Sequence, residues 1–239
     1  MRHLPAALAA VGIAAAAMVS AHGASAQTPP VTAIDIALEP DSVMTARAHA
    51  DNARLLAAFP KGFALDATHH AHVTMLQQFV VTADLDEVYA AVGKVMAKER
   101  PADWKLTAFK YYYIPSPPVG LAGIVVEPTP DLLRLQRELI EAVAPYVAKA
   151  GTPAAFVSSE GGADIQRALI DYVANFNAVA AGERFNPHVT VGVALQSYLD
   201  PMLAAPFAAF TFSPAGASVY QLGAFGTARK ELKALTLAP

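Results

Sequence analysis

The chain has 239 residues, of which 54% are hydrophobic and 15% are charged, and its formal net charge is −3. It contains no cysteine, which excludes disulfide scaffolds, zinc-thiolate sites and cysteine nucleophiles, and its hydrophobicity excludes wholesale disorder. A mildly acidic chain also lacks the basic surface of a general nucleic-acid-binding protein, so any phosphate must be bound locally by a few placed groups.

The first 26 residues have the pattern of a secretory signal peptide. Met1-Arg2-His3 precedes an apolar run to about Val19, and Ala24-Ser25-Ala26 is a triplet of the kind that signal peptidase cuts. The run is shorter than the roughly 20 residues that span a bilayer, and no later stretch is long enough. We therefore predict export with cleavage before Gln27, a periplasmic or secreted mature protein, and no membrane association after cleavage.

The next segment, residues 27–65, is predicted to be a leader with one helix. It is rich in proline at its start, and Asp41 can cap a helix that ends near Ala58. The elements that follow are a strand over 71–81, a helix in which Asp84 and Glu87 form a capping-box pattern, and a long hairpin of strands over 104–114 and 119–127. A helix then begins at Thr129-Pro130.

The second half repeats this order of elements. A loop over 151–162 is followed by an amphipathic helix that is marked by Ile165, Leu169, Val173 and Phe176 and ends before Gly182. A strand over 186–194, a short helix or turn over 196–204, and strands over 207–213, 217–225 and 232–237 come next. We therefore predict an α+β fold in a single bilobed domain over residues 66–239. Two largely antiparallel sheets flanked by helices would be related by a pseudo-two-fold axis, with a cleft between the lobes.

One tetrapeptide pattern occurs twice, each time inside a predicted strand: His72-Val73-Thr74-Met75 and His188-Val189-Thr190-Val191. Because side chains alternate across a strand, the histidine and the threonine of each motif share one face and the apolar residues share the other. A pseudo-two-fold would bring two imidazoles and two hydroxyls to one cleft. One imidazole can then accept a proton from the attacking water while the other protonates the leaving oxygen, and the threonines can donate to phosphoryl oxygens.

Paired His-x-Thr motifs on the strands of a duplicated α+β fold resemble the two-histidine phosphoesterase superfamily. This superfamily includes the bacterial 2'-5' RNA ligase family and cyclic phosphodiesterases. The resemblance spans roughly residues 66–237 and carries over four positions, His72, Thr74, His188 and Thr190. It implies metal-independent cleavage or formation of a phosphodiester, most often the opening of a cyclic phosphate. For an exported chain we favour a 2',3'-cyclic phosphate on a nucleotide or RNA end as the substrate.

Other residues are weaker candidates for substrate contacts. Tyr111 and Tyr113 share a strand face and could stack a base at the rim of the cleft, although such aromatics are more often core pairs. Arg184 and Phe185 precede the second motif and could hold a phosphate and a base, although an arginine in a loop is more often simply solvated.

Two alternative functions remain open at this point. The cleft could bind a nucleotide or phosphate in the periplasm without turning it over. His70 and His72 could instead chelate a metal in a histidine-based hydrolase, but a carboxylate partner at similar spacing is lacking. We expect no metal and no cofactor, a nucleotide or RNA-end substrate, and a monomer.

Overall fold

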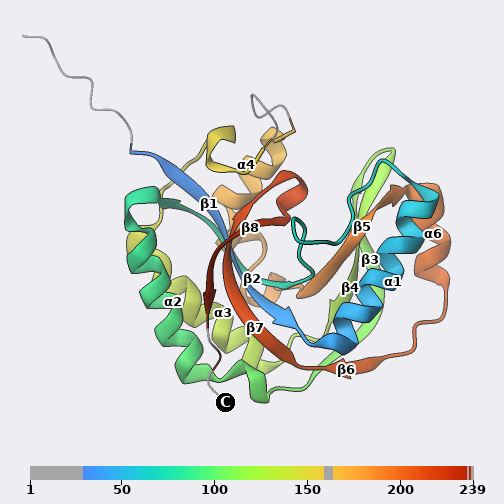
Figure 1. Cartoon of the computed structure of the whole chain (residues 1–239), viewed down its shortest axis with the longest axis horizontal. Helices are drawn as coiled ribbons and strands as arrows, with labels where there is room; N and C mark the ends of the chain where they lie inside the picture. The colour runs from blue at the N-terminus through green and yellow to red at the C-terminus, as the bar shows by residue number, and fades with distance from the viewer. Residues whose placement is uncertain (1–28, 159–163, 236, 238–239) are drawn as a thin grey trace, which may run out of the picture.

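The computed structural model describes residues 29–158, 164–235 and 237, so the predicted signal peptide lies outside the described residues. Within them the strands form one curled antiparallel sheet in the order β6-β3-β4-β5-β2-β1-β7-β8 (Figure 1). The strands are β1 (Val31–Pro40), β2 (Val73–Val81), β3 (Leu106–Ser116), β4 (Val119–Val126), β5 (His188–Leu195), β6 (Phe210–Phe212), β7 (Pro214–Leu222) and β8 (Ala228–Leu235).

Helices cover the outer side of both halves of the sheet. Helices α1 (Ser42–Ala58) and α6 (Gln196–Ala204) pack against the half that contains β3, β4 and β5. Helix α3 (Pro130–Val143) packs against β2 in the other half, and α2 (Leu85–Glu99) packs on α3 (Figure 1). The short helices α4 (Arg167–Ala174) and α5 (Phe176–Val179) also contact β2.

The predicted α+β class with antiparallel strands is confirmed, but the strands form one sheet instead of two. The halves meet between β5 and β2, where Val189 pairs with Val73. These two valines are the second residues of the repeated tetrapeptides. The expected pseudo-two-fold arrangement is therefore present only approximately, as two four-stranded halves joined at the motifs.

Strand β1 was not predicted, and it changes the role of the leader segment. It pairs with β2 on one side and with β7 on the other, so residues 31–40 lie inside the sheet. Prolines at both ends and an aspartate in the middle concealed it, since proline and aspartate are depleted in strands. The boundary placed at residue 66 thus divides segments that share one sheet.

The predicted hairpin of β3 and β4 is confirmed, as is the helix that Thr129 caps through its side-chain oxygen. The capping box at the start of α2 is not formed. Residues Thr82–Asp84 make a 3-10 turn that runs directly into α2, and Asp84 makes no side-chain cap hydrogen bond. The chain therefore enters α2 already coiled and needs no separate cap.

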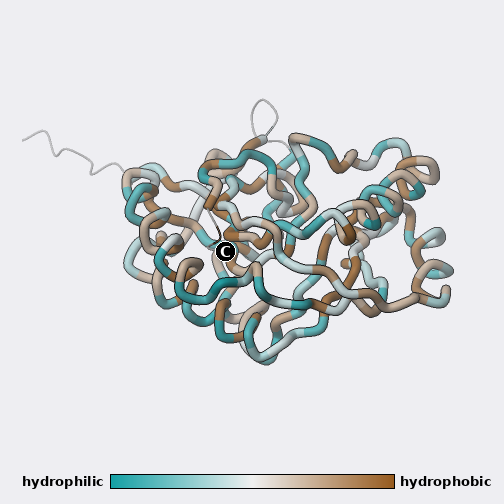
Figure 2. The backbone as a smooth tube through the Cα atoms, turned by 60° about the horizontal axis from the view of Figure 1, so that its bottom comes forward, coloured by the Kyte–Doolittle hydropathy of each residue, from teal (hydrophilic) through white to brown (hydrophobic). Residues whose placement is uncertain are grey.

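The core lies between the sheet and the outer helices. Coloured by hydropathy, the helical turns alternate between hydrophilic and hydrophobic segments, as expected for amphipathic helices (Figure 2). Helix α3 shows the pattern most clearly, because Leu132, Leu135, Leu139 and Val143 are all fully buried. Among the described residues, no helix has the length and apolar character needed to cross a bilayer.

Two buried amides tie the outer helices to the sheet. Asn52 of α1 donates to the carbonyls of Phe63 and Val191 and accepts from the Leu65 amide. Gln136 of α3 also forms three hydrogen bonds, two as a donor and one as an acceptor. Every polar atom of both side chains is thereby satisfied, as burial requires.

Candidate active site

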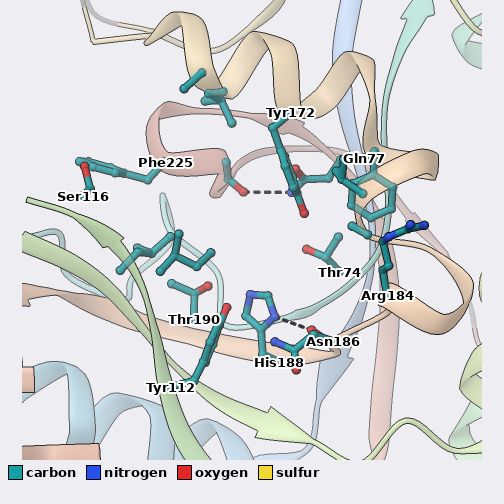
Figure 3. A pocket seen from close by; sticks show the side chains of 18 of the residues that line it. Thr74, Gln77, Tyr112, Ser116, Tyr172, Arg184, Asn186, His188, Thr190 and Phe225 are labelled. Carbon is teal, nitrogen blue, oxygen red and sulfur yellow. Dashed lines mark hydrogen bonds between the residues drawn. The ribbon is translucent and has the colours of Figure 1, made fainter. Parts of the chain in front are cut away.

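A cavity of about 470 Å³ opens at the junction of the two halves of the sheet. Both His-x-Thr motifs line it, together with side chains from β3, β4, α4, α5 and the turn at Ala224–Gly226. Figure 3 shows Tyr112, His188 and Thr190 on one side, with Tyr172 and Gln77 across from them. Its volume falls within the range of small-molecule sites, about 300–1,000 Å³.

The two histidines are held in the same way. His72 Nδ1 lies 2.7 Å from the His70 carbonyl oxygen, and His188 Nδ1 lies 2.7 Å from the Asn186 carbonyl oxygen. A carbonyl oxygen can only accept, so each Nδ1 carries a hydrogen and donates it. Nε2 is consequently the atom of each ring that is left for proton transfer.

The surroundings of the two rings differ. His72 is 6% exposed, and its Nε2 lies 3.3 Å from the buried carboxylate of Asp35 on β1. Burial lowers the pKa of His72, but the Asp35 charge and hydrogen bond raise it more, so the net pKa lies above its usual value. Burial lowers the pKa of His188 to about 4, and the nearby His72 contributes to the same lowering.

The two threonines also differ. Thr74 Oγ1 donates to Asp35 Oδ2 at 2.9 Å. The prediction that Thr74 donates to a phosphoryl oxygen would therefore require this bond to break. Thr190 lines the cavity, and its side chain has no hydrogen-bond partner in the part of the chain that the structure describes. Its hydroxyl hydrogen is available to a ligand.

Tyr112, and not Tyr111 or Tyr113, reaches the cavity from β3. Tyr111 lies on the opposite face, where its hydroxyl donates to Asp51 of α1, and the hydroxyl of Tyr113 donates to Asp200 of α6. The two tyrosines do share one face, as predicted, but that face is covered by helices. Tyr112 packs edge-on against the His188 ring with 4.7 Å between ring centroids.

Gly123 on the neighbouring strand makes room for Tyr112. The two residues are directly paired between β3 and β4, and a Cβ atom on Gly123 would lie 2.6 Å from Cε1 of Tyr112. Gly123 also pairs with Thr190 on β5. The missing side chain thus lets the tyrosine ring lie flat over β4 and extend toward the second motif.

Arg184 and Phe185 both line the cavity, as the sequence suggested. The segment that carries them is fixed by Gln136, whose amide nitrogen donates to the Ala180 carbonyl while its oxygen accepts from the Gly182 amide. The same amide nitrogen contacts the carbonyl of Met75 at 3.2 Å. Arg184 is the only lysine or arginine among the described residues that line the cavity.

Besides Tyr112, sequence reasoning missed Asp35, Gln77, Tyr172 and Phe225. Asp35 lies on the unpredicted strand β1. Gln77 lies three residues after the first threonine and donates to Asp35. It also donates to the Gly226 carbonyl, the bond drawn as a dashed line beside Gln77 in Figure 3. Tyr172 belongs to α4. Phe225 is 47% exposed and has a left-handed backbone with φ of 60°, which is unfavourable for an aromatic residue. No sequence pattern marked these positions.

The metal alternative rested on a pair of ligands, His70 and His72. His70 does not line the cavity: its Nε2 contacts the Ala67 carbonyl, and its ring packs against Tyr220. Among the described residues, no group of three or more histidine, aspartate and glutamate side chains is arranged to hold a metal ion. His72 Nε2 lies instead beside the Asp35 carboxylate.

The fold and the two motifs at one cavity are those expected of a two-histidine phosphoesterase. The chain belongs to the 2'-5' RNA ligase superfamily, whose family model matches residues 40–212, more than half of the sequence. No curated protein matches the chain. Solved structures with a similar fold share little sequence with it.

Three of these structures are matched over nearly all of their own chains. TT0787 of Thermus thermophilus is 16% identical over 86% of this chain and 98% of that chain, with a TM-score of 0.48. Escherichia coli LigT complexed with NADP+ is 15% identical over 87% and 99%, with a TM-score of 0.42. LigT complexed with 3'-AMP is 16% identical over 86% and 98%, with a TM-score of 0.41.

Proposed function

We propose that this phosphoesterase hydrolyses a 2',3'-cyclic phosphate on a nucleotide or a short RNA end, and that it does so without a metal. The observation that carries the proposal is the matched tethering of the two histidines. Each ring donates from Nδ1 to a carbonyl two residues earlier, and both rings line one cavity. Two imidazoles whose Nε2 atoms are not bound by a backbone carbonyl suit in-line attack of water, since one can accept a proton while the other supplies one.

The lining of the cavity favours a small substrate with a single negative charge. Aromatic and aliphatic side chains dominate it, and Arg184 is the one cationic residue besides the histidines among the described residues. A cyclic mononucleotide has one ionised phosphodiester and one flat base, whereas a long RNA would place several phosphates near the opening. We propose that Arg184 and Thr190 bind the phosphoryl oxygens and that Tyr112, Tyr172, Phe185 and Phe225 contact the base.

We further propose that the protein acts outside the cytoplasm. The support is the signal-peptide pattern of residues 1–26, which ends in a cleavable small-residue triplet. An exported cyclic phosphodiesterase would act on nucleotides or RNA fragments released into the periplasm or the medium. Detection of the mature N-terminus at Gln27 in the exported fraction tests this proposal, and retention of an uncleaved chain in the cytoplasm would refute it.

The decisive experiment measures turnover by residues 27–239 in EDTA. A panel of 2',3'-cyclic mononucleotides is supplied, and the 2'- and 3'-phosphate products are separated by chromatography. The variants are His72→Ala and His188→Ala, with His49→Ala as a matched control, because His49 is an exposed histidine of α1 that does not line the cavity. We expect a loss of turnover of at least about 100-fold in the first two variants and none in the control.

The same experiment separates the alternatives. Tight nucleotide binding measured by calorimetry, with no product from the wild type, would establish a binding protein instead of an enzyme. Activity that disappears in EDTA and returns with a stoichiometric divalent metal would establish a metal hydrolase.

A further inference from the structure

The two His-x-Thr motifs have the same sequence pattern, but only one of them lies beside a buried carboxylate. We propose that Asp35 is a positioning residue that keeps His72 protonated as the general acid and holds the hydroxyl hydrogen of Thr74. His188 is then the general base, and Thr190 is the motif hydroxyl that donates to the phosphoryl group. This inference rests on the proposed phosphoesterase function and assigns the roles within it.

Asp35 is fully buried on β1, between β2 and β7. Its Oδ2 atom accepts from Thr74 Oγ1 at 2.9 Å and from Gln77 Nε2 at 2.8 Å, and it lies 3.3 Å from His72 Nε2. Its Oδ1 atom has no hydrogen-bond partner within the described part of the chain. Two neutral donors cannot compensate a full buried charge, whereas an imidazolium can.

The other groups around this pair do not supply a positive charge. Among the described residues no lysine or arginine forms an ion pair with Asp35. The ionisable groups that face His72 and Asp35 come from the surrounding strands and helices, and none of them is a lysine or an arginine. They are Glu39 on β1, His70 before β2, Tyr172 on α4, His188 on β5 and Tyr220 on β7.

The hydrogen bonds of the two rings assign the remaining protons. Because His72 Nδ1 donates to the His70 carbonyl, the second hydrogen of a His72 imidazolium lies on Nε2, the atom 3.3 Å from Asp35 Oδ2. His188 faces no carboxylate within hydrogen-bonding distance among the described residues, so its Nε2 keeps a lone pair directed at the cavity. The pKa of His72, raised by Asp35 against the effect of burial, and that of His188, lowered by burial to about 4, agree with this assignment.

The resulting step conserves atoms and charge. His188 Nε2 takes a proton from water as the water oxygen bonds to phosphorus. The bond from phosphorus to the ribose oxygen breaks, and that oxygen takes the proton from His72 Nε2. The product is a ribose hydroxyl and a phosphate monoester, and exchange with solvent returns the proton from His188 to His72.

The test compares Asp35→Asn with Asp51→Asn. Asp51 is a matched buried carboxylate, 2% exposed, which binds Arg47 and Arg54 on the helical side of the sheet. For Asp35→Asn we expect the alkaline limb of kcat/KM against pH to move down by about 1–3 pH units. Asp51→Asn should leave that limb in place. An unmoved limb in Asp35→Asn would overturn the assignment.

The protonation states of His72 and His188 can also be measured directly in the wild-type protein without substrate. This test needs neither turnover nor a stable Asp35 variant. Long-range proton–nitrogen NMR of wild-type residues 27–239 reports the protonation state of each ring, and His72→Gln identifies the His72 signals. We expect His72 to be an imidazolium near neutral pH and His188 to be neutral with hydrogen on Nδ1. A neutral His72 at that pH would refute the role of Asp35, whereas absent turnover with the expected spectra would refute only the substrate.

Discussion

Asn52 and Gln136 occupy equivalent places in the two halves of the molecule. Asn52 of α1 donates to the carbonyl of Val191, and Gln136 of α3 donates to the carbonyl of Met75. Val191 and Met75 are the fourth residues of the two repeated tetrapeptides. Each motif strand is therefore attached, one residue beyond its threonine, to a buried amide from the helix that covers its own half.

Removing either amide should loosen the strand that it holds. In Asn52→Leu and Gln136→Leu, backbone groups lose their partners inside the core, at a cost of about 1–3 kcal/mol for each unsatisfied group. We expect lower urea midpoints and a kcat that falls with them, measured by fluorescence-detected unfolding and the cyclic-phosphate assay. Gln166→Leu is the control, since Gln166 is exposed and makes no side-chain cap bond; equal stability of all three variants would contradict the expectation.

His72→Ala should destabilise the protein more than His188→Ala. Without His72 the Asp35 charge remains buried without compensation, which typically costs about 3–5 kcal/mol. No such charge lies beside His188. Unfolding in urea at neutral pH measures the difference, and the double variant Asp35→Asn/His72→Ala should recover most of the loss. If the double variant were less stable than His72→Ala, the pair would not be ionic.

Thr190→Val should reduce turnover more than Thr74→Val does. The hydroxyl of Thr190 has no described partner and can donate to a phosphoryl oxygen, whereas that of Thr74 is already committed to Asp35. Loss of one such donor typically lowers kcat by about 100-fold or more. Steady-state kinetics with a cyclic mononucleotide at mildly acidic pH checks the order, and a larger loss in Thr74→Val would reverse our interpretation.

The free energy of unfolding should decrease as the pH is lowered from about 6.5 to about 4, because of His188. The pKa of His188 is about 4 in the folded protein and about 6.5 in the unfolded chain. Between these two pH values His188 is protonated in the unfolded chain but neutral in the folded protein, which favours unfolding. The contribution of neutral His188 to stability is fully present above its pKa in the unfolded chain. It is lost as the pH falls through its pKa in the folded protein. Thermal unfolding in a buffer series tests it. The decline should be shallower in His188→Gln, which has no titrating ring.

The sequence predicted the central part of the site because alternation in a strand is a local rule. It placed His72 and Thr74 together on one face, and His188 and Thr190 likewise, and the cavity contains all four. The same rule grouped Tyr111 with Tyr113 correctly. It could not say which face of β3 meets the helices, since that depends on the curl of the whole sheet, and so Tyr112 was overlooked.

Asp35 was missed for a different physical reason. A lone aspartate between prolines, in a segment next to an expected cleavage site, lacks the features of a buried strand. Only the pairing of β1 with β2 and β7 brings it to His72, and that pairing joins residues far apart in the chain. Its burial is tolerated because the imidazole lies 3.3 Å away, a relationship that no local pattern encodes.

The position of β1 has a practical consequence for anyone trimming the chain to its matched region. A fragment of residues 40–212 would omit nearly all of β1 and the whole of β7 and β8, leaving one long side of β2 without its neighbour. That side would expose a row of unpaired amide and carbonyl groups, a ready template for self-association. Such a fragment should precipitate upon expression, although it contains both histidines.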